Sequence, residues 1–305
     1  MIRTAALLAA AALALAQAGS ADERHAVASG GRERTYRLHA PASLPPDRPA
    51  PLVLVFHGGE GDGRSAERLT GFDAGADREG YLVAYPDAFE KHWNDGRDVA
   101  AFTAYRERID DVAFVAALLD DVAVKHAVDL KRVFATGISN GAIFANFLAL
   151  RLADRIAAIA PVAGGLAAPL PPTLRPARPV SVLLLNGTDD PLVPYDGGAV
   201  ARTHGRVVGA EETARRWAQA DGCSASAARD APPARPGAEC AIERSRWSGG
   251  REGTEVLLYT LKGGGHTWPG GPQSAPRPLV GRVCREPDAT RTIWEFFCDH
   301  PRRGP

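Results

Sequence analysis

A serine framed by two glycines is the first candidate for chemistry in this chain. Residues 137–141, Gly-Ile-Ser-Asn-Gly, fit the pattern G-x-S-x-G, whose serine is a nucleophile when the motif joins a strand to a helix. The apolar segment 132–137 leads into Ser139, and the almost wholly apolar segment 141–152 follows it. The pentapeptide alone fits an ordinary turn with a capping serine equally well. The flanking segments favour Ser139 as a nucleophile.

A nucleophilic serine needs a base, and three histidines follow it in the chain: His204, His266 and His300. In the fold built around this motif the order along the chain is serine, acid, histidine. His300 lies among charged residues near the C-terminus, and no strand-like segment precedes His204. His266 follows the apolar segment 254–261 and three glycines, which let a loop approach the serine without steric hindrance. We therefore expect His266 to be the general base.

The acid should follow a strand that lies between the serine and the histidine. The apolar segment 180–185 leads into a turn that carries both Asp189 and Asp190. Either carboxylate could hold His266 in its correct tautomer and stabilise its charged form. The residue pattern by itself leaves the choice open.

A serine nucleophile in this motif also needs two backbone N–H groups to bind the oxyanion that develops on its substrate. One donor is the residue after the nucleophile, here Asn140, and the other comes from the loop after an early strand. That loop is His-Gly-Gly-Glu-Gly at 57–61, and its donor is either Gly59 or Glu60. We take Gly59, because glycine lets the backbone approach an oxyanion closely.

The elements that position these residues follow from short apolar runs and helical spacing. Wholly apolar runs bounded by turn residues predict strands buried on both faces of a parallel sheet. Such runs occupy residues 52–56, 81–85, 132–137, 180–185 and 254–261. Helices are predicted at 109–126, 141–152, 211–220 and 290–298, and surface loops at 41–51 and 224–239. The alternation predicts an α/β fold with a mainly parallel sheet flanked by helices, in one catalytic domain over 22–305.

Composition and the N-terminus bear on location and partners. Of the 305 residues, 36 are Lys or Arg and 36 are Asp or Glu, so no basic surface for nucleic acid is indicated. Arg3, the apolar run 5–16 and the small residues up to Ala21 predict a cleavable signal peptide at 1–21. The run is shorter than the roughly 20 residues that a membrane span needs. We expect a secreted or periplasmic protein with no membrane partner.

Four cysteines, an even number, suggest two disulfides in an exported chain. Proximity in the sequence favours the pairs Cys223–Cys240 and Cys284–Cys298 among three possible connectivities. No CxxC spacing or histidine pair indicates a metal site, so we expect neither a metal nor an organic cofactor.

The chain resembles a family of secreted esterases that contains polyhydroxybutyrate-depolymerase-like and feruloyl-esterase-like enzymes of the α/β-hydrolase fold. The resemblance covers most of residues 35–300, and its most specific segments are Trp-Asn-Asp-Gly-Arg and Gly-His-Thr-Trp-Pro-Gly. The matching segments lie at 57–59, 92–97, 110–112, 137–141, 160–164, 186–194 and 265–270.

The resemblance also assigns residues. The family's acid turn is similar to His-Gly-Thr-x-Asp-x-x-Val-Pro, which places the catalytic aspartate at Asp190 and puts Asn186 where histidine is usual. Trp93 and Trp268 are interpreted as walls of the ester pocket, with packing in the core as an equally weighted alternative. Tyr195 is a weaker candidate for the same role.

The activity that the resemblance implies is hydrolysis of a carboxylic ester by a serine, histidine and aspartate triad. We expect hydroxyalkanoate oligomers or related short or aromatic esters, with plant cell-wall phenolic esters as the alternative. Depolymerases of solid polymer often carry an extra linker and adsorption domain, which we do not expect here, so we expect short soluble esters or oligomers rather than solid polymer. A peptidase of the same fold and a non-catalytic binding protein are the rival hypotheses.

Overall fold

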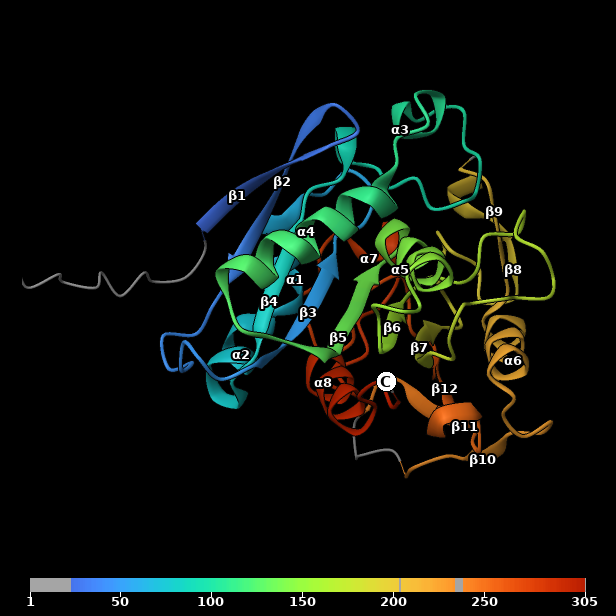
Figure 1. Ribbon diagram of the computed structural model, residues 1–305. Helices are drawn as coiled ribbons and strands as arrows, with labels where there is room; N and C mark the ends of the chain where they lie inside the picture. Colours follow the sequence, from blue (N-terminus) through green and yellow to red (C-terminus); the bar gives the residue numbers. More distant parts are fainter. Residues whose placement is uncertain (1–22, 203, 234–237, 305) are drawn as a thin grey trace, which may run out of the picture.

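The computed structural model describes residues 23–202, 204–233 and 238–304, so the predicted signal peptide at 1–21 lies outside the described residues (Figure 1). The core of the described chain is a ten-stranded sheet, with a separate pair formed by β8 (Gly197–Ala199) and β9 (Arg206–Val208). In spatial order the large sheet contains β1 (Glu23–Ser29), β2 (Arg32–His39), β4 (Leu82–Pro86), β3 (Ala50–Phe56), β5 (Val128–Ile138), β6 (Ala158–Val162), β7 (Ser181–Gly187), β12 (Val256–Lys262), β11 (Ala241–Trp247) and β10 (Ala228–Asp230).

The middle of this sheet is parallel, and antiparallel strands extend it at both edges. Strands β4, β3, β5, β6, β7 and β12 are parallel neighbours. The five strands predicted from apolar runs are all present, and the prediction of an α/β fold with a mainly parallel sheet is confirmed. Strand β6 was not predicted, because alanine and Pro161 have low strand propensity. Its place between β5 and β7 makes it a strand, fully buried on both faces.

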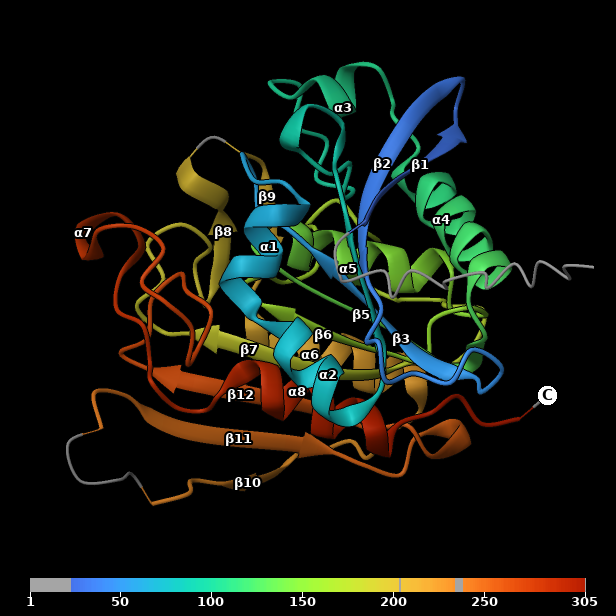
Figure 2. The same cartoon turned by 90° about the vertical axis from the view of Figure 1, so that its left-hand side faces the viewer.

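Helices cover both faces of the sheet, as Figures 1 and 2 show from two sides. On one face lie α4 (Asp111–Lys125), α5 (Asn140–Arg151) and α6 (Ala210–Asp221); on the other lie α1 (Gly63–Thr70), α2 (Phe72–Glu79) and α8 (Ala289–Asp299). The remaining short helices are η1 (Phe89–Lys91), α3 (Thr103–Arg106), η2 (Val200–Arg202), η3 (Arg251–Gly253) and α7 (Arg277–Val280). In the described ranges, no helix is both long enough and apolar enough to cross a bilayer.

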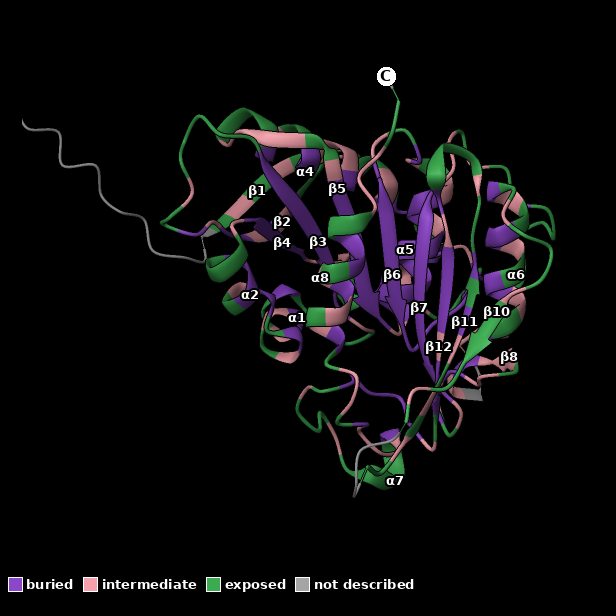
Figure 3. Cartoon of the chain, turned by 90° about the horizontal axis from the view of Figure 1, so that it is seen from below, coloured by how far each residue is buried: buried purple, intermediate pink, exposed green. Residues whose placement is uncertain are grey.

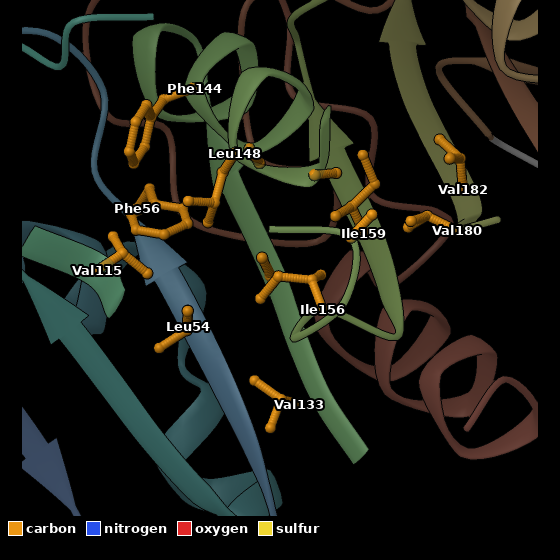
Figure 4. Close-up of a cluster of buried hydrophobic side chains, with 14 of the residues drawn as sticks. Leu54, Phe56, Val115, Val133, Phe144, Leu148, Ile156, Ile159, Val180 and Val182 are labelled. Atoms are coloured by element: carbon orange, nitrogen blue, oxygen red, sulfur yellow. The ribbon is translucent and has the colours of Figure 1, made fainter. Parts of the chain in front are cut away.

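The period of two along each strand divides the core into two layers. Leu54 and Phe56 of β3 pack with Phe144 and Leu148 of α5, a cluster drawn in Figure 4. The intervening Val55 packs on the opposite face, among residues of α1, α2 and α8. Because both faces are covered, the central strands are buried along most of their length (Figure 3). Such two-sided burial explains why the strands read as continuous apolar runs in the sequence.

The cysteines pair differently from the prediction by proximity. Cys240 and Cys284 form a disulfide with a Cα–Cα distance of 5.6 Å, while Cys223 and Cys298 are free thiols, so both predicted pairs are wrong. The register of the sheet explains the outcome. Ala241, next to Cys240, pairs with Lys262 at the end of β12. The segment around Cys284 folds back onto the loop that follows β12, which brings the two thiols together.

We expect the double substitution Cys240→Ala/Cys284→Ala to lower the melting temperature, because the disulfide closes a loop across 44 residues. A native cross-link of this kind stabilises by about 2–4 kcal/mol. In a domain of this size that corresponds to a loss of roughly 5–10 °C in thermal unfolding. The matched control is Cys223→Ala/Cys298→Ala, which removes only free thiols and should leave the melting temperature nearly unchanged. Equal losses in the two variants would contradict the pairing.

Candidate active site

Ser139 occupies a strained turn between β5 and α5. Its backbone has φ 58° and ψ −122°, a conformation that a residue with a side chain adopts only when its surroundings enforce it. The Ser139 N–H donates to the carbonyl of Val162 (3.1 Å). A Cβ at Gly141 would lie 2.4 Å from the carbonyl oxygen of Phe56, so only glycine lets the turn pack onto the end of β3. This geometry is that of the predicted strand–turn–helix motif.

His266 and Asp190 form a buried hydrogen-bonded pair. The distance from His266 Nδ1 to Asp190 Oδ2 is 2.8 Å, and both side chains are buried. The other oxygen, Asp190 Oδ1, accepts the N–H groups of Leu192 and Val193, each at 2.8 Å. Asp189 is exposed, and its carboxylate accepts a hydrogen bond from the neighbouring Thr188 hydroxyl. The structure thus brings Asp190, and not Asp189, to His266.

The loop that carries His266 packs directly on the acid turn. A Cβ at Gly187 would lie 2.2 Å from the carbonyl oxygen of Gly264, and one at Gly265 would lie 2.3 Å from that of Val280. The His266 N–H donates to the Val280 carbonyl at 2.6 Å. The glycines before His266 therefore serve close backbone packing on both sides of the loop, and this packing sets the place of the imidazole.

Ser139 and His266 line the same cavity, which has a volume of about 420 Å³. Gly59 and Asn140, the two predicted oxyanion donors, line it as well. Its apolar lining comes from Leu69, Ile138, Leu192, Val200 and Val280. A larger hollow of about 1010 Å³ lies along α2 and α8, but none of the predicted catalytic residues borders it. The smaller cavity is therefore the candidate active site.

One wall of this cavity is a stack of rings that the sequence pattern did not indicate. The ring centroids of His92 and Phe102 are 3.7 Å apart with an angle of 16° between the planes, and His204 meets Phe102 edge-on at 4.9 Å. Partial burial, helped by Arg97 and His92, lowers the pKa of His204, which keeps this ring neutral at neutral pH. Nothing in the spacing of Phe102 points to a pocket, and His92 was noted only as part of a family segment.

The loop at 57–61, which we call the oxyanion loop, lies against the nucleophile. A Cβ at Gly58 would lie 3.4 Å from Cβ of Ser139. The Glu60 N–H is already used, because it donates to the Lys91 carbonyl at 3.1 Å. Within the described ranges the Gly59 N–H has no protein acceptor. Of the two donors considered from the sequence, Gly59 is the one whose N–H is available.

His57, which begins this loop, has both ring nitrogens engaged. Its Nδ1 lies 2.7 Å from the Gly58 carbonyl, and its Nε2 accepts the Ala88 N–H at 3.0 Å. Burial lowers the pKa of His57, so the ring is neutral with the proton on Nδ1. This histidine holds the loop in place and has no free nitrogen for proton transfer.

The two tryptophans interpreted as pocket walls belong to the core instead. Trp93 is fully buried, lies flat on Phe144 with centroids 4.9 Å apart, and donates from Nε1 to the His57 carbonyl at 3.0 Å. Trp268 is also buried, and its Nε1 donates to the Thr290 hydroxyl at 3.0 Å. Neither ring lines the cavity that holds the serine. Trp93 is bonded to the loop that carries Gly59, and Trp268 lies two residues after His266. The interpretation of the two rings as pocket walls was therefore wrong.

Two further residues singled out from the sequence also have structural partners. The Tyr195 hydroxyl lies 2.6 Å from the Thr260 hydroxyl, and Tyr195 does not border the cavity. Asn186, where the family usually has histidine, is buried and donates from Nδ2 to the Gly164 carbonyl at 3.3 Å. Over the residues that the structure describes, no group of three or more potential metal ligands occurs.

Comparison with known proteins places the chain among esterases. The model of the family described as esterase PHB depolymerase matches residues 35–168. The putative esterase NocK of Nocardia uniformis subsp. tsuyamanensis is 34% identical over 284 residues, which are 89% of this chain and 81% of NocK. Feruloyl esterase B of Piromyces equi is 30% identical, and the match spans 74% of this chain but 41% of that protein.

Solved structures agree on the fold. The acetyl xylan esterase from Aspergillus awamori superposes with a TM-score of 0.58 at 15% identity, covering 80% of this chain and 94% of that one. The sequence and the fold lead to one conclusion. The chain belongs to the esterase PHB depolymerase family of carboxylic ester hydrolases with the α/β-hydrolase fold.

Proposed function

We propose that this protein is an exported serine esterase in which Ser139 is the nucleophile, His266 the general base and Asp190 the residue that orients His266. The observation that carries the proposal is the 2.8 Å hydrogen bond between His266 Nδ1 and Asp190, beside the cavity that Ser139 also lines. The bond holds the proton on Nδ1 and leaves Nε2 to accept the serine proton. The strained turn at Ser139 supports the same reading.

In the first half of the reaction, Ser139 Oγ attacks the ester carbonyl carbon while His266 takes the hydroxyl proton. The imidazolium that forms is stabilised by the Asp190 carboxylate, which stays ionised. Collapse of the tetrahedral intermediate breaks the bond to the alcohol oxygen, and His266 returns the proton to the leaving alcohol. Water then attacks the acyl-enzyme with His266 again as base, which releases the acid and restores Ser139.

The negative charge on the carbonyl oxygen is bound by the backbone N–H groups of Gly59 and Asn140. This assignment is supported by the available N–H of Gly59 and by the place of Asn140 at the start of α5. The positive end of the helix dipole, at the N-terminus of α5, adds to the stabilisation of this charge. Each donor of this kind contributes about 3 kcal/mol of transition-state stabilisation.

For the substrate we propose a short hydroxyalkanoate oligomer or a related short ester. The cavity volume of about 420 Å³ is at the small end for ligand sites, and its lining includes five leucine, isoleucine and valine side chains. Short aliphatic chains suit such a lining, because burying them removes apolar surface from water.

An ester with an aromatic acyl group, such as a feruloyl ester, is the second candidate. The stack of His92 and Phe102 with the edge of His204 favours it. Planar aromatic groups gain contact area and favourable ring geometry beside such a wall.

We also propose that residues 1–21 direct export and that residues 22–305 form the mature catalytic domain. The disulfide between Cys240 and Cys284 supports an oxidising location, because disulfides persist outside the reducing cytoplasm.

Replacing the nucleophile tests the enzyme class directly. We expect wild type to be labelled by a fluorophosphonate and Ser139→Ala to lose both the label and, by about 10⁴-fold or more, the turnover of nitrophenyl acetate. The control is Ser274→Ala, another serine that borders the cavity, which should keep the label. Wild type that takes no label, or label that persists in Ser139→Ala, would contradict the serine mechanism.

The two aspartates of the acid turn make a matched pair. Asp190→Asn should lower kcat for nitrophenyl acetate by about 10³–10⁴-fold, because an amide at this position selects the wrong histidine tautomer. Asp189→Asn, one residue away and exposed, should change kcat less than about twofold. Similar losses in both variants would be incompatible with Asp190 as the orienting residue.

A substrate panel separates the two candidate ester classes. We expect kcat/KM to be higher for hydroxybutyrate oligomers than for methyl ferulate, with short nitrophenyl esters as the reference. Phe102→Ala then provides the internal comparison, since loss of the aromatic wall should lower ferulate turnover by about 10-fold if aromatic acyl groups bind there. A preference for ferulate, together with that loss, would replace the first candidate by the second.

A further inference from the structure

The carboxamide of Asn140 is held by a segment far away in the sequence, residues 93–95. Its Oδ1 accepts the Trp93 N–H at 2.8 Å, and its Nδ2 donates to the Trp93 carbonyl at 3.1 Å. The second Nδ2 hydrogen goes to Asp95 Oδ2 at 2.7 Å. Asn140 is buried, with 4% of its surface exposed. We call these three hydrogen bonds the Asn140 clamp.

Asp95, which anchors the clamp, is itself completely buried and forms an ion pair with Arg97. Its two oxygens accept from Arg97 Nε at 3.0 and 2.9 Å, and Arg97 Nη2 lies 2.8 Å from Oδ2. The Tyr105 hydroxyl donates to the same carboxylate, and burial together with Asp95 raises the pKa of Tyr105, which keeps it a donor. A buried carboxylate with this many fixed donors has little freedom to move.

The backbone of Asn140 is one of the two oxyanion donors in the proposed mechanism. A residue at the first position of a helix has no intrahelical acceptor for its N–H. The direction of that N–H depends on what holds the residue, and here the clamp holds its side chain at three points. Preorganised donors stabilise a transition state because they need no reorientation when charge develops.

We propose that Asp95, supported by Arg97, is a positioning residue that orients the Asn140 N–H toward the oxyanion through the Asn140 clamp. The proposal rests on the proposed serine esterase function. It assigns a role to the Trp-Asn-Asp-Gly-Arg segment, which touches none of the reacting atoms.

Arg97 also ties the oxyanion donor to the pocket wall. Its Nη1 donates to the carbonyl of His204 at 2.7 Å, and His204 belongs to the ring stack with Phe102. One buried ion pair thereby fixes both the wall beside the substrate and the donor that binds its carbonyl oxygen. A disturbance of the pair should act on the transition state, because oxyanion contacts are made most strongly there.

The test compares two asparagines of α5. Asn140→Ala keeps the backbone N–H but removes the clamp, and we expect kcat for nitrophenyl acetate to fall about 10- to 100-fold with KM changed less than threefold. The matched control is Asn146→Ala. Asn146 is equally buried on the same helix and hydrogen-bonds Trp217 and Ala142, away from the clamp. The Asn146→Ala variant should have a lower melting temperature and a kcat near the wild-type value.

A second readout reports on the oxyanion itself. A trifluoromethyl ketone forms a tetrahedral adduct with the serine, so its affinity should fall in Asn140→Ala in proportion to kcat, and should be retained in Asn146→Ala. If Asn140→Ala does not fold, Asp95→Asn is the second variant. This substitution replaces one acceptor oxygen by an NH2 donor and removes the charge that pairs with Arg97. The donors of Asn140, Arg97 and Tyr105 can then no longer all be accepted, and we expect kcat to fall at least about fivefold.

The outcomes separate this inference from the proposed function. A folded Asn140→Ala or Asp95→Asn enzyme with wild-type kcat and wild-type inhibitor affinity would overturn the positioning role, while labelling of Ser139 would still support the esterase. Wild type without any fluorophosphonate labelling would reject the function as a whole. A rise in KM with unchanged kcat would also overturn the positioning role, because it would place the effect on ground-state binding.

Discussion

The contact between the serine turn and the end of β3 is the constraint on which the rest of the site depends. The turn can reach the Phe56 carbonyl because position 141 has no side chain, and a Cβ there would approach that oxygen to 2.4 Å. The same contact brings the loop after β3 beside Ser139, so that nucleophile and oxyanion loop share one edge of the sheet. The strain at Ser139, with φ 58°, is tolerated because packing on both sides determines the backbone.

The remaining parts of the site assemble at this edge because parallel neighbours end side by side. Strands β7 and β12 are adjacent, with Leu261 in register with Gly187, so the acid turn and the histidine loop leave the sheet together. Close packing of Gly187 on Gly264 joins them directly. The disulfide from Cys284 to Cys240 then ties the segment behind the histidine loop to the beginning of β11.

Buried charge around the site is arranged to hold backbone in place. The pairs Asp95–Arg97 and Arg34–Asp111 are both buried. Asp111 also accepts the backbone N–H of Asn94, and Asp95 accepts the side-chain amide of Asn140. Buried ion pairs add little net stability, since desolvation offsets their attraction. Their effect here is geometric. The two aspartates, each part of a family segment in the sequence, hold Asn94 and Asn140 in place.

The sequence by itself determined whatever depends on local pattern. Apolar runs predicted the central strands, and the glycines around Ser139, with a strand before and a helix after, predicted the nucleophile turn, because tight turns constrain residue type locally. The residue pattern left the choice between Asp189 and Asp190 open, the family resemblance favoured Asp190, and the fold brings Asp190 to His266. Only the tertiary structure decided which cysteines pair and that Trp93 and Trp268 pack in the core. Asp189 and Asp190 are equivalent by pattern and differ only in where the folded turn directs them. Such outcomes depend on strand register and on contacts between residues distant in the chain, which no local spacing encodes.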